Sequence, residues 1–114
     1  MAIIASPAEA HHSLSAYDRS TSRKVMGVVK EYEWANPHVK LVLVVTDAAG
    51  SARDWFFESG SIGRMSSRGF NRVSATPGEP VTVSYHPRRD GGGGGFFLSI
   101  VNAKGRTYGP IMVR

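Results

Sequence analysis

The sequence predicts a mainly β protein: a five-stranded OB-like curled barrel with one short helix between the third and fourth strands. The chain has 114 residues, which is enough for one domain and not for two. Short apolar segments separated by turns rich in Gly and Pro predict strands, and one segment with helix-capping residues interrupts them. A small open β-sandwich is the alternative arrangement.

The composition excludes several classes of protein. With 41% hydrophobic and 20% charged residues, the chain is too apolar to be disordered. It contains no cysteine, which excludes disulfides and thiolate metal sites, and no apolar run approaches the roughly 18 residues of a membrane span. The net charge is +5, but the arginines are scattered, with only Arg64, Arg68 and Arg72 at helical spacing.

Residues 1–10 resemble the end of a secretory signal peptide. Ala8 and Ala10 occupy the two positions that a signal peptidase reads, whereas the charged start and most of the apolar core are missing. We therefore expect a periplasmic or secreted protein, or a cytoplasmic one if Met1 is the true start. The predicted organisation is a signal-peptide remnant or disordered tail, a polar lead-in and one β-barrel domain, at residues 1–10, 11–23 and 24–114.

The first predicted strand, Lys24–Trp34, changes its apolar face midway. Val25 and Val29 lie on one face, whereas Tyr32 and Trp34 lie on the other. Because side chains alternate strictly along a strand, this change requires a β-bulge or a sharp bend.

The next two predicted strands form a hairpin. Val39–Asp47 is apolar on both faces and is therefore expected to be central, and Ala52–Glu58 returns after an Asp-Ala-Ala-Gly turn. In the return strand Trp55 and Phe57 face the core, whereas Phe56 lies on the opposite face.

Ser61 is the predicted cap of a short helix that runs to about Arg68 and ends at Gly69. Its inward side chains are expected to be Ile62, Met65 and Ser66. The remaining predicted elements, in chain order, are a turn at 76–79, a strand at 81–85, a mobile loop at Gly91–Gly95, a strand at 96–101 and short edge pairing at 106–108 and 111–113.

Seven short motifs occur in order along the chain: His11-His12-Ser13, Gly27-x-Val29, Trp34-x-Asn36-Pro37-His38, Trp55-x-Phe57-Glu58, Arg68-Gly69-Phe70, Pro77-Gly78-Glu79-x-Val81-Thr82-Val83 and Arg89-Asp90-Gly91. Together they resemble the bacterial family called domain of unknown function 6152, which comprises small exported proteins. The resemblance implies export to the periplasm and supplies no established activity. The glycine run here is longer than the usual loop of that family.

The adjacent histidines His11 and His12 are the sharpest candidates for a metal site. Cleavage after Ala10 would make His11 the first residue, so that its amine and imidazole could bind one copper ion. Cleavage after Ala8 would instead place His11 third, in a square-planar site for Cu(II) or Ni(II).

Three further residues could complete such a site. His38 follows the Asn-Pro corner, where it either supplies a third nitrogen or donates to a backbone carbonyl. Glu58 ends a strand and could add an oxygen ligand, pair with an arginine or stabilise the helix start. His86 is expected to be an exposed strand end and is the weakest candidate ligand.

A ligand or partner surface is predicted from exposed aromatic, amide and basic residues near the barrel rim. One of the adjacent Phe96 and Phe97 is expected to leave the core face beside the glycine loop. The candidates for this surface are Trp34, Asn36, Phe56, Arg64, Arg68, Phe96 and Phe97.

These features favour a non-catalytic exported binding module, with no certain cofactor and copper as the sharpest candidate ligand. The chain contains neither the Gly-x-Ser-x-Gly nor the His-Glu-x-x-His motif, so no catalytic residues are assigned. One alternative is an OB-like domain that binds nucleic acid or another anion through its arginines. Another is an accessory subunit that docks on a larger exported enzyme.

Overall fold

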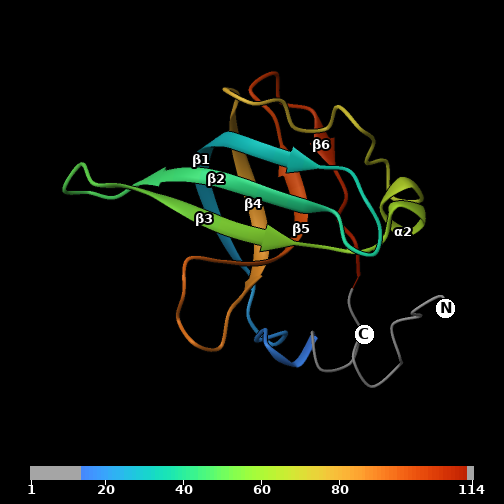
Figure 1. Cartoon of the computed structure of the whole chain (residues 1–114), viewed down its shortest axis with the longest axis horizontal. Coiled ribbons are helices and arrows are strands. Elements are labelled where there is room, and N and C mark those ends of the chain that lie inside the picture. The colour runs from blue at the N-terminus through green and yellow to red at the C-terminus, as the bar shows by residue number, and fades with distance from the viewer. Residues whose placement is uncertain (1–13, 113–114) are drawn as a thin grey trace, which may run out of the picture.

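The computed structural model describes residues 14–112. Six strands and one short helix follow each other along this part of the chain (Figure 1). Their bounds are β1 (Arg23–Glu33), β2 (Lys40–Thr46), β3 (Ala52–Glu58), α2 (Ile62–Ser66), β4 (Pro80–Pro87), β5 (Gly94–Val101) and β6 (Thr107–Tyr108).

Five of the strands close into a barrel. The sheet order is β3-β2-β1-β4-β5-β6, and a parallel pairing of β3 with β5 joins the two sides. This closed sheet, with one short helix between β3 and β4, confirms the predicted barrel, and the open sandwich is wrong. Edge pairing is confirmed for β6. In the second predicted edge segment, the amide of the buried Ile111 donates a 3.0 Å hydrogen bond to the carbonyl of Leu98, and residue 113 lies outside the described residues.

The predicted irregularity in the first strand is confirmed. The pairing of β1 with β2 shifts register between Val29 and Glu31, and the first half of β1 pairs with β4 instead. As a result Val29 is buried, and Tyr32 and Trp34 beyond the bulge still pack against the same core.

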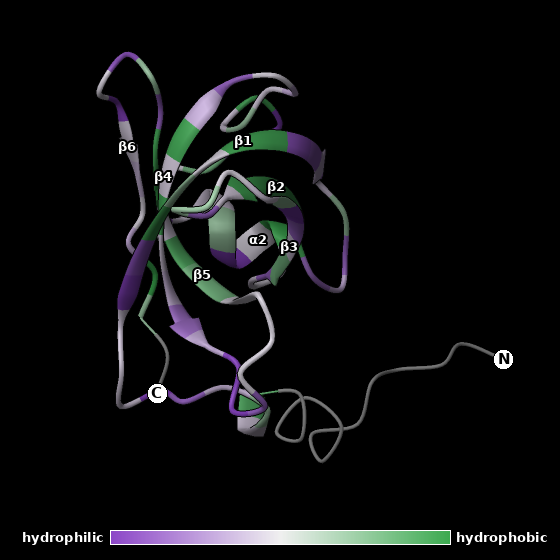
Figure 2. Ribbon diagram, turned by 90° about the vertical axis from the view of Figure 1, so that its left-hand side faces the viewer, coloured by the Kyte–Doolittle hydropathy of each residue, from purple (hydrophilic) through white to green (hydrophobic). Residues whose placement is uncertain are grey.

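The helix α2 covers one end of the barrel. Figure 2 shows it in the middle of the ring of strands, and Met65 on it is fully buried. Ser61 caps it as predicted, because its hydroxyl accepts a hydrogen bond from the third amide, 3.3 Å away. The helix is shorter than predicted and ends at Ser66, which is exposed, so Arg68 and Arg72 lie beyond it. No helix among residues 14–112 is long and apolar enough to cross a membrane.

The glycine run does not form a loop throughout its length, contrary to the prediction. Gly94 and Gly95 are buried in β5, where they pair with Phe56 and Phe57 of β3. A β-carbon on Gly94 would lie 1.9 Å from the carbonyl oxygen of Phe56, and one on Gly95 would lie 2.0 Å from that of His86. The absence of side chains therefore allows the strands to approach and the barrel to close.

The prediction that Phe96 or Phe97 leaves the core face is wrong, since both are buried. Phe97 lies inside the barrel against Phe70, with ring centroids 5.9 Å apart. Phe96 is covered by Tyr17 from residues 14–22, the described part of the lead-in, at 5.8 Å. A segment outside the predicted barrel domain thus supplies the cover for an outward-facing phenylalanine.

Candidate functional site

The Asn36-Pro37 corner sets His38 at the rim of the barrel. The side-chain oxygen of Asn36 accepts a hydrogen bond from the amide of Ile62, 2.9 Å away, which ties the corner to the start of α2. The next residue, Val39, is fully buried and anchors the chain in the core. Because β2 begins where its antiparallel neighbour β3 ends, His38 lies beside Glu58.

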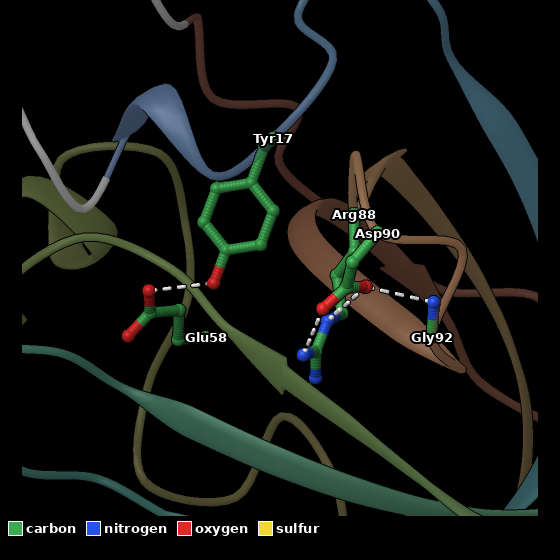
Figure 3. Close-up of polar contacts among 5 residues, drawn as sticks. All are labelled: Tyr17, Glu58, Arg88, Asp90 and Gly92. Carbon is green, nitrogen blue, oxygen red and sulfur yellow. Dashed lines mark hydrogen bonds and ion pairs between the residues drawn. The ribbon is translucent and has the colours of Figure 1, made fainter.

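Glu58 joins His38 to the lead-in. Its Oε2 atom lies 3.5 Å from Nδ1 of His38, and its Oε1 atom accepts a 2.6 Å hydrogen bond from the hydroxyl of Tyr17 (Figure 3). The side chains of His38 and Glu58 are 33% and 23% exposed, so that a solute can reach both. In the described residues the ring of His38 contacts this carboxylate rather than a backbone carbonyl.

The phenol of Tyr17 is held in its protonated form. Burial raises its pKa, and the hydrogen bond to the Glu58 carboxylate raises that pKa further. The unperturbed value is 10.0, so the stabilisation from this contact is present below that pH and is lost as the pH rises through the higher folded value. Tyr17 is therefore a hydrogen-bond donor to Glu58 at neutral pH.

Backbone hydrogen bonds fix the lead-in against the segment that follows β4. The amide of Asp18 donates to the carbonyl of Pro87 at 2.8 Å, and the amide of Arg89 donates to that of Ala16 at 2.9 Å. Nδ1 of His86 lies 2.8 Å from the carbonyl of Thr21. His86 is only 9% exposed, so its predicted position at an exposed strand end is wrong.

We predict that Tyr17→Phe loosens the lead-in without unfolding the barrel. The change removes the donor to a partly buried carboxylate, a loss of about 1–3 kcal/mol. Amide hydrogen exchange at residues 16–19 should therefore become about five-fold faster or more. Tyr32→Phe is the matched control, because the Tyr32 hydroxyl donates to the carbonyl of Asn71 outside the lead-in. Equal exchange at residues 16–19 in the Tyr17→Phe variant and the unmodified protein would contradict the prediction.

The residues predicted for a ligand surface do not form one surface. Phe56 is 57% exposed on the outer face of β3, and Trp34 is partly buried against Tyr32. Arg64 in α2 and Arg68 just beyond it are exposed, and the guanidinium of Arg64 donates to the carbonyl of Met112. Asn36 has the structural role described above, and Phe96 and Phe97 are buried.

The proposed histidine cluster falls partly outside the described residues. His11 and His12 precede residue 14, and among residues 14–112 no three side chains of the types His, Cys, Asp and Glu come together as a metal site would require. His38 and Glu58 are the candidate ligands that the structure brings together. Together they offer one imidazole nitrogen and one carboxylate to an incoming ion.

A groove of about 780 Å³ runs beside this pair, between the lead-in and the outer face of β1, β2 and β3. Sequence reasoning assigned no role to Glu31, Glu33, Lys40 or Tyr17, all of which line it. Tyr17 carried one usable signal, since it is the one aromatic residue in the polar lead-in 11–23. Glu31 and Glu33 carried only the alternation that is typical of an exposed strand face.

Comparison with known proteins identifies a family for this chain. Residues 1–97 match the model of a family described as a family of unknown function, DUF6152. No curated protein and no solved structure matches the chain. Because the family model covers most of the 114 residues, the chain belongs to the DUF6152 family.

Proposed function

We propose that this protein is an exported, non-catalytic binding module that takes up Cu(II) through His11, His12 and His38, with Glu58 beside them. The observation that carries the proposal is the 2.6 Å hydrogen bond from Tyr17 to Glu58. It fixes the chain just downstream of the paired histidines against the carboxylate that faces His38. Export is the part of the proposal that rests on the signal-like residues 1–10 and on the family resemblance.

The length of the chain supports this assignment. His12 precedes Tyr17 by five positions, and an extended chain of that length spans at most about 18 Å. The N-terminal histidines are therefore close enough in sequence to reach the His38–Glu58 pair when the helical turn at Leu14 and Ser15 extends. A longer or unanchored connection would lose more conformational entropy when the ligands come together.

The donor set suits copper better than other common ions. A terminal amine and imidazoles are nitrogen ligands, and Cu(II) stands at the top of the affinity order for such ligands. The imidazoles must be unprotonated to bind, so affinity is expected to fall as the pH falls. The protonated phenol of Tyr17 would orient Glu58 rather than bind the ion itself.

A titration with Cu(II) tests the proposal. We expect the chain that begins at His11 with a free amine to bind at least about ten-fold more tightly than the same chain acetylated at His11. His38→Ala should also weaken binding about ten-fold or more, and electron paramagnetic resonance should show nitrogen ligands. Equal affinity of the free and acetylated chains would overturn the role of the terminus. An affinity unchanged by His38→Ala would overturn the third ligand.

The nucleic-acid alternative is less well supported by the charges. Arg64, Arg68 and Arg72 do not share a helix, because α2 ends at Ser66. The groove beside the candidate site carries four carboxylates and three cationic side chains, which disfavours a phosphate backbone. Docking through Phe96 and Phe97 is not supported either, since both are buried.

A further inference from the structure

We propose that the groove between the lead-in and the outer face of β1–β3 binds an extended basic segment of a partner protein. The inference does not require copper, because it rests chiefly on Phe56, Glu31 and Glu33, although Glu58 of the candidate metal site also lines the groove. The groove volume of about 780 Å³ is within the range of pockets that bury a small ligand or a few residues of peptide.

Phe56 provides the apolar anchor of this groove. It is 57% exposed, although phenylalanine is usually buried, and it lies directly opposite Val42 on β2. Val42 in turn lies opposite Glu31 on β1, so the three side chains form one row across the outer face of the barrel. An exposed aromatic residue among polar neighbours in a groove is typical of a site where binding energy is concentrated.

The charges of the groove favour a cationic occupant. It carries a net charge of −1, from four carboxylates and three cations, in a chain whose total is +5. The guanidinium of Arg88 is already paired with Asp90 through contacts of 3.0 and 2.7 Å (Figure 3). Glu31 and Glu33 are exposed and have no hydrogen bond or ion pair with any other side chain among residues 14–112.

The spacing of the two carboxylates indicates an extended segment. Glu31 and Glu33 are alternate residues of β1 beyond its bulge, so they point to the same face about 6.6 Å apart along the strand. Basic side chains separated by one residue in an extended peptide have the same spacing. Such a segment can therefore place two cations against the carboxylates and an apolar side chain from a further alternate position, on the same face of the peptide, on Phe56.

Two other occupants fit the charges less well. Residues 1–13 contain no lysine or arginine, so the chain's own N-terminal segment lacks the cations that the groove favours. A nucleic acid carries the same sign of charge as Glu31 and Glu33 and would be repelled. A basic segment of another protein satisfies both the charge and the apolar anchor.

The test uses two dye-labelled peptides of equal length, with the repeats Lys-Ser-Lys-Ser-Phe-Ser and Glu-Ser-Glu-Ser-Phe-Ser, in which the charged and aromatic side chains share one face of the extended peptide. Fluorescence anisotropy measures their binding to the full chain. We expect the basic peptide to bind at least about ten-fold more tightly than the acidic one. The double variant Glu31→Gln/Glu33→Gln should lose this preference, and Glu31→Lys/Glu33→Lys should reverse it. Phe56→Ala should weaken binding of the basic peptide about ten-fold or more.

Val73→Ala is the matched control for Phe56→Ala, since Val73 is 69% exposed and does not line the groove. The proposal is overturned by equal binding of the two peptides, by no binding of the basic peptide at about 1 mM, or by a preference that survives in the Gln variant. A dimer that Phe56→Ala abolishes, seen by light scattering, would make a second copy the occupant and would likewise overturn it. Unchanged copper binding by the Glu31→Gln/Glu33→Gln variant would separate this site from the metal site, whereas its loss would contradict their independence.

Discussion

Replacing Gly95 with alanine is expected to open the barrel and to lower the free energy of unfolding by about 3 kcal/mol, at the upper end for overpacking. The added β-carbon would lie 2.0 Å from the carbonyl oxygen of His86, a backbone atom that has no rotamer to change. Gly95 pairs with β3 and β4 at once, opposite Phe57 and Pro87. Separating these strands would disrupt the pairing that closes the sheet.

Urea unfolding followed by circular dichroism measures this effect, and Gly63→Ala is the matched control. Gly63 lies in α2 with nothing within 4 Å of its added β-carbon and no positive φ angle. Alanine there should leave the stability unchanged or raise it by up to about 1 kcal/mol. If Gly95→Ala were as stable as Gly63→Ala, the parallel pairing of β3 with β5 would not be what holds the barrel closed.

The glycine run also shows where sequence reasoning fails. A strand is recognised by the alternation of apolar and polar side chains, which five consecutive glycines cannot display. The hairpin strand Ala52–Glu58 was predicted with the observed bounds, because it has both an alternating pattern and a clear turn before it. Burial of Gly94 and Gly95 depends instead on backbone contacts with β3 and β4.

The candidate site, too, was predictable from the sequence only in part. His38 and Glu58 lie near opposite ends of a hairpin in sequence, and antiparallel pairing of Lys40 with Glu58 brings them together. Tyr17 contacts Glu58 across 41 positions of sequence, from a lead-in without strand or helix periodicity. No local pattern encodes such a contact, so the anchor of the lead-in could be found only from the folded chain.

Phe97→Ala and Phe96→Ala are expected to have different effects, although the two residues are adjacent. Phe97 is fully buried in the barrel against Phe70, so its truncation should lower the free energy of unfolding by about 3–5 kcal/mol. Phe96 is covered by Tyr17, so its truncation should chiefly release the lead-in. Urea unfolding measures the first effect, and limited proteolysis between residues 18 and 24 measures the second.

This comparison decides whether the lead-in is part of the cooperative barrel. Its contacts with the barrel include the ring contact of Tyr17 with Phe96, the hydrogen bond from Tyr17 to Glu58, and the backbone bonds to Pro87 and from Arg89. Such a segment can open at a lower free energy than the strands it covers. Rapid cleavage in Phe96→Ala, with an unfolding midpoint above that of Phe97→Ala, would identify the lead-in as a separable strap. Equal midpoints of the two variants and equal resistance to protease would show that the lead-in unfolds only with the barrel, and the hydrogen bond from Tyr17 to Glu58 would then belong to the cooperative core.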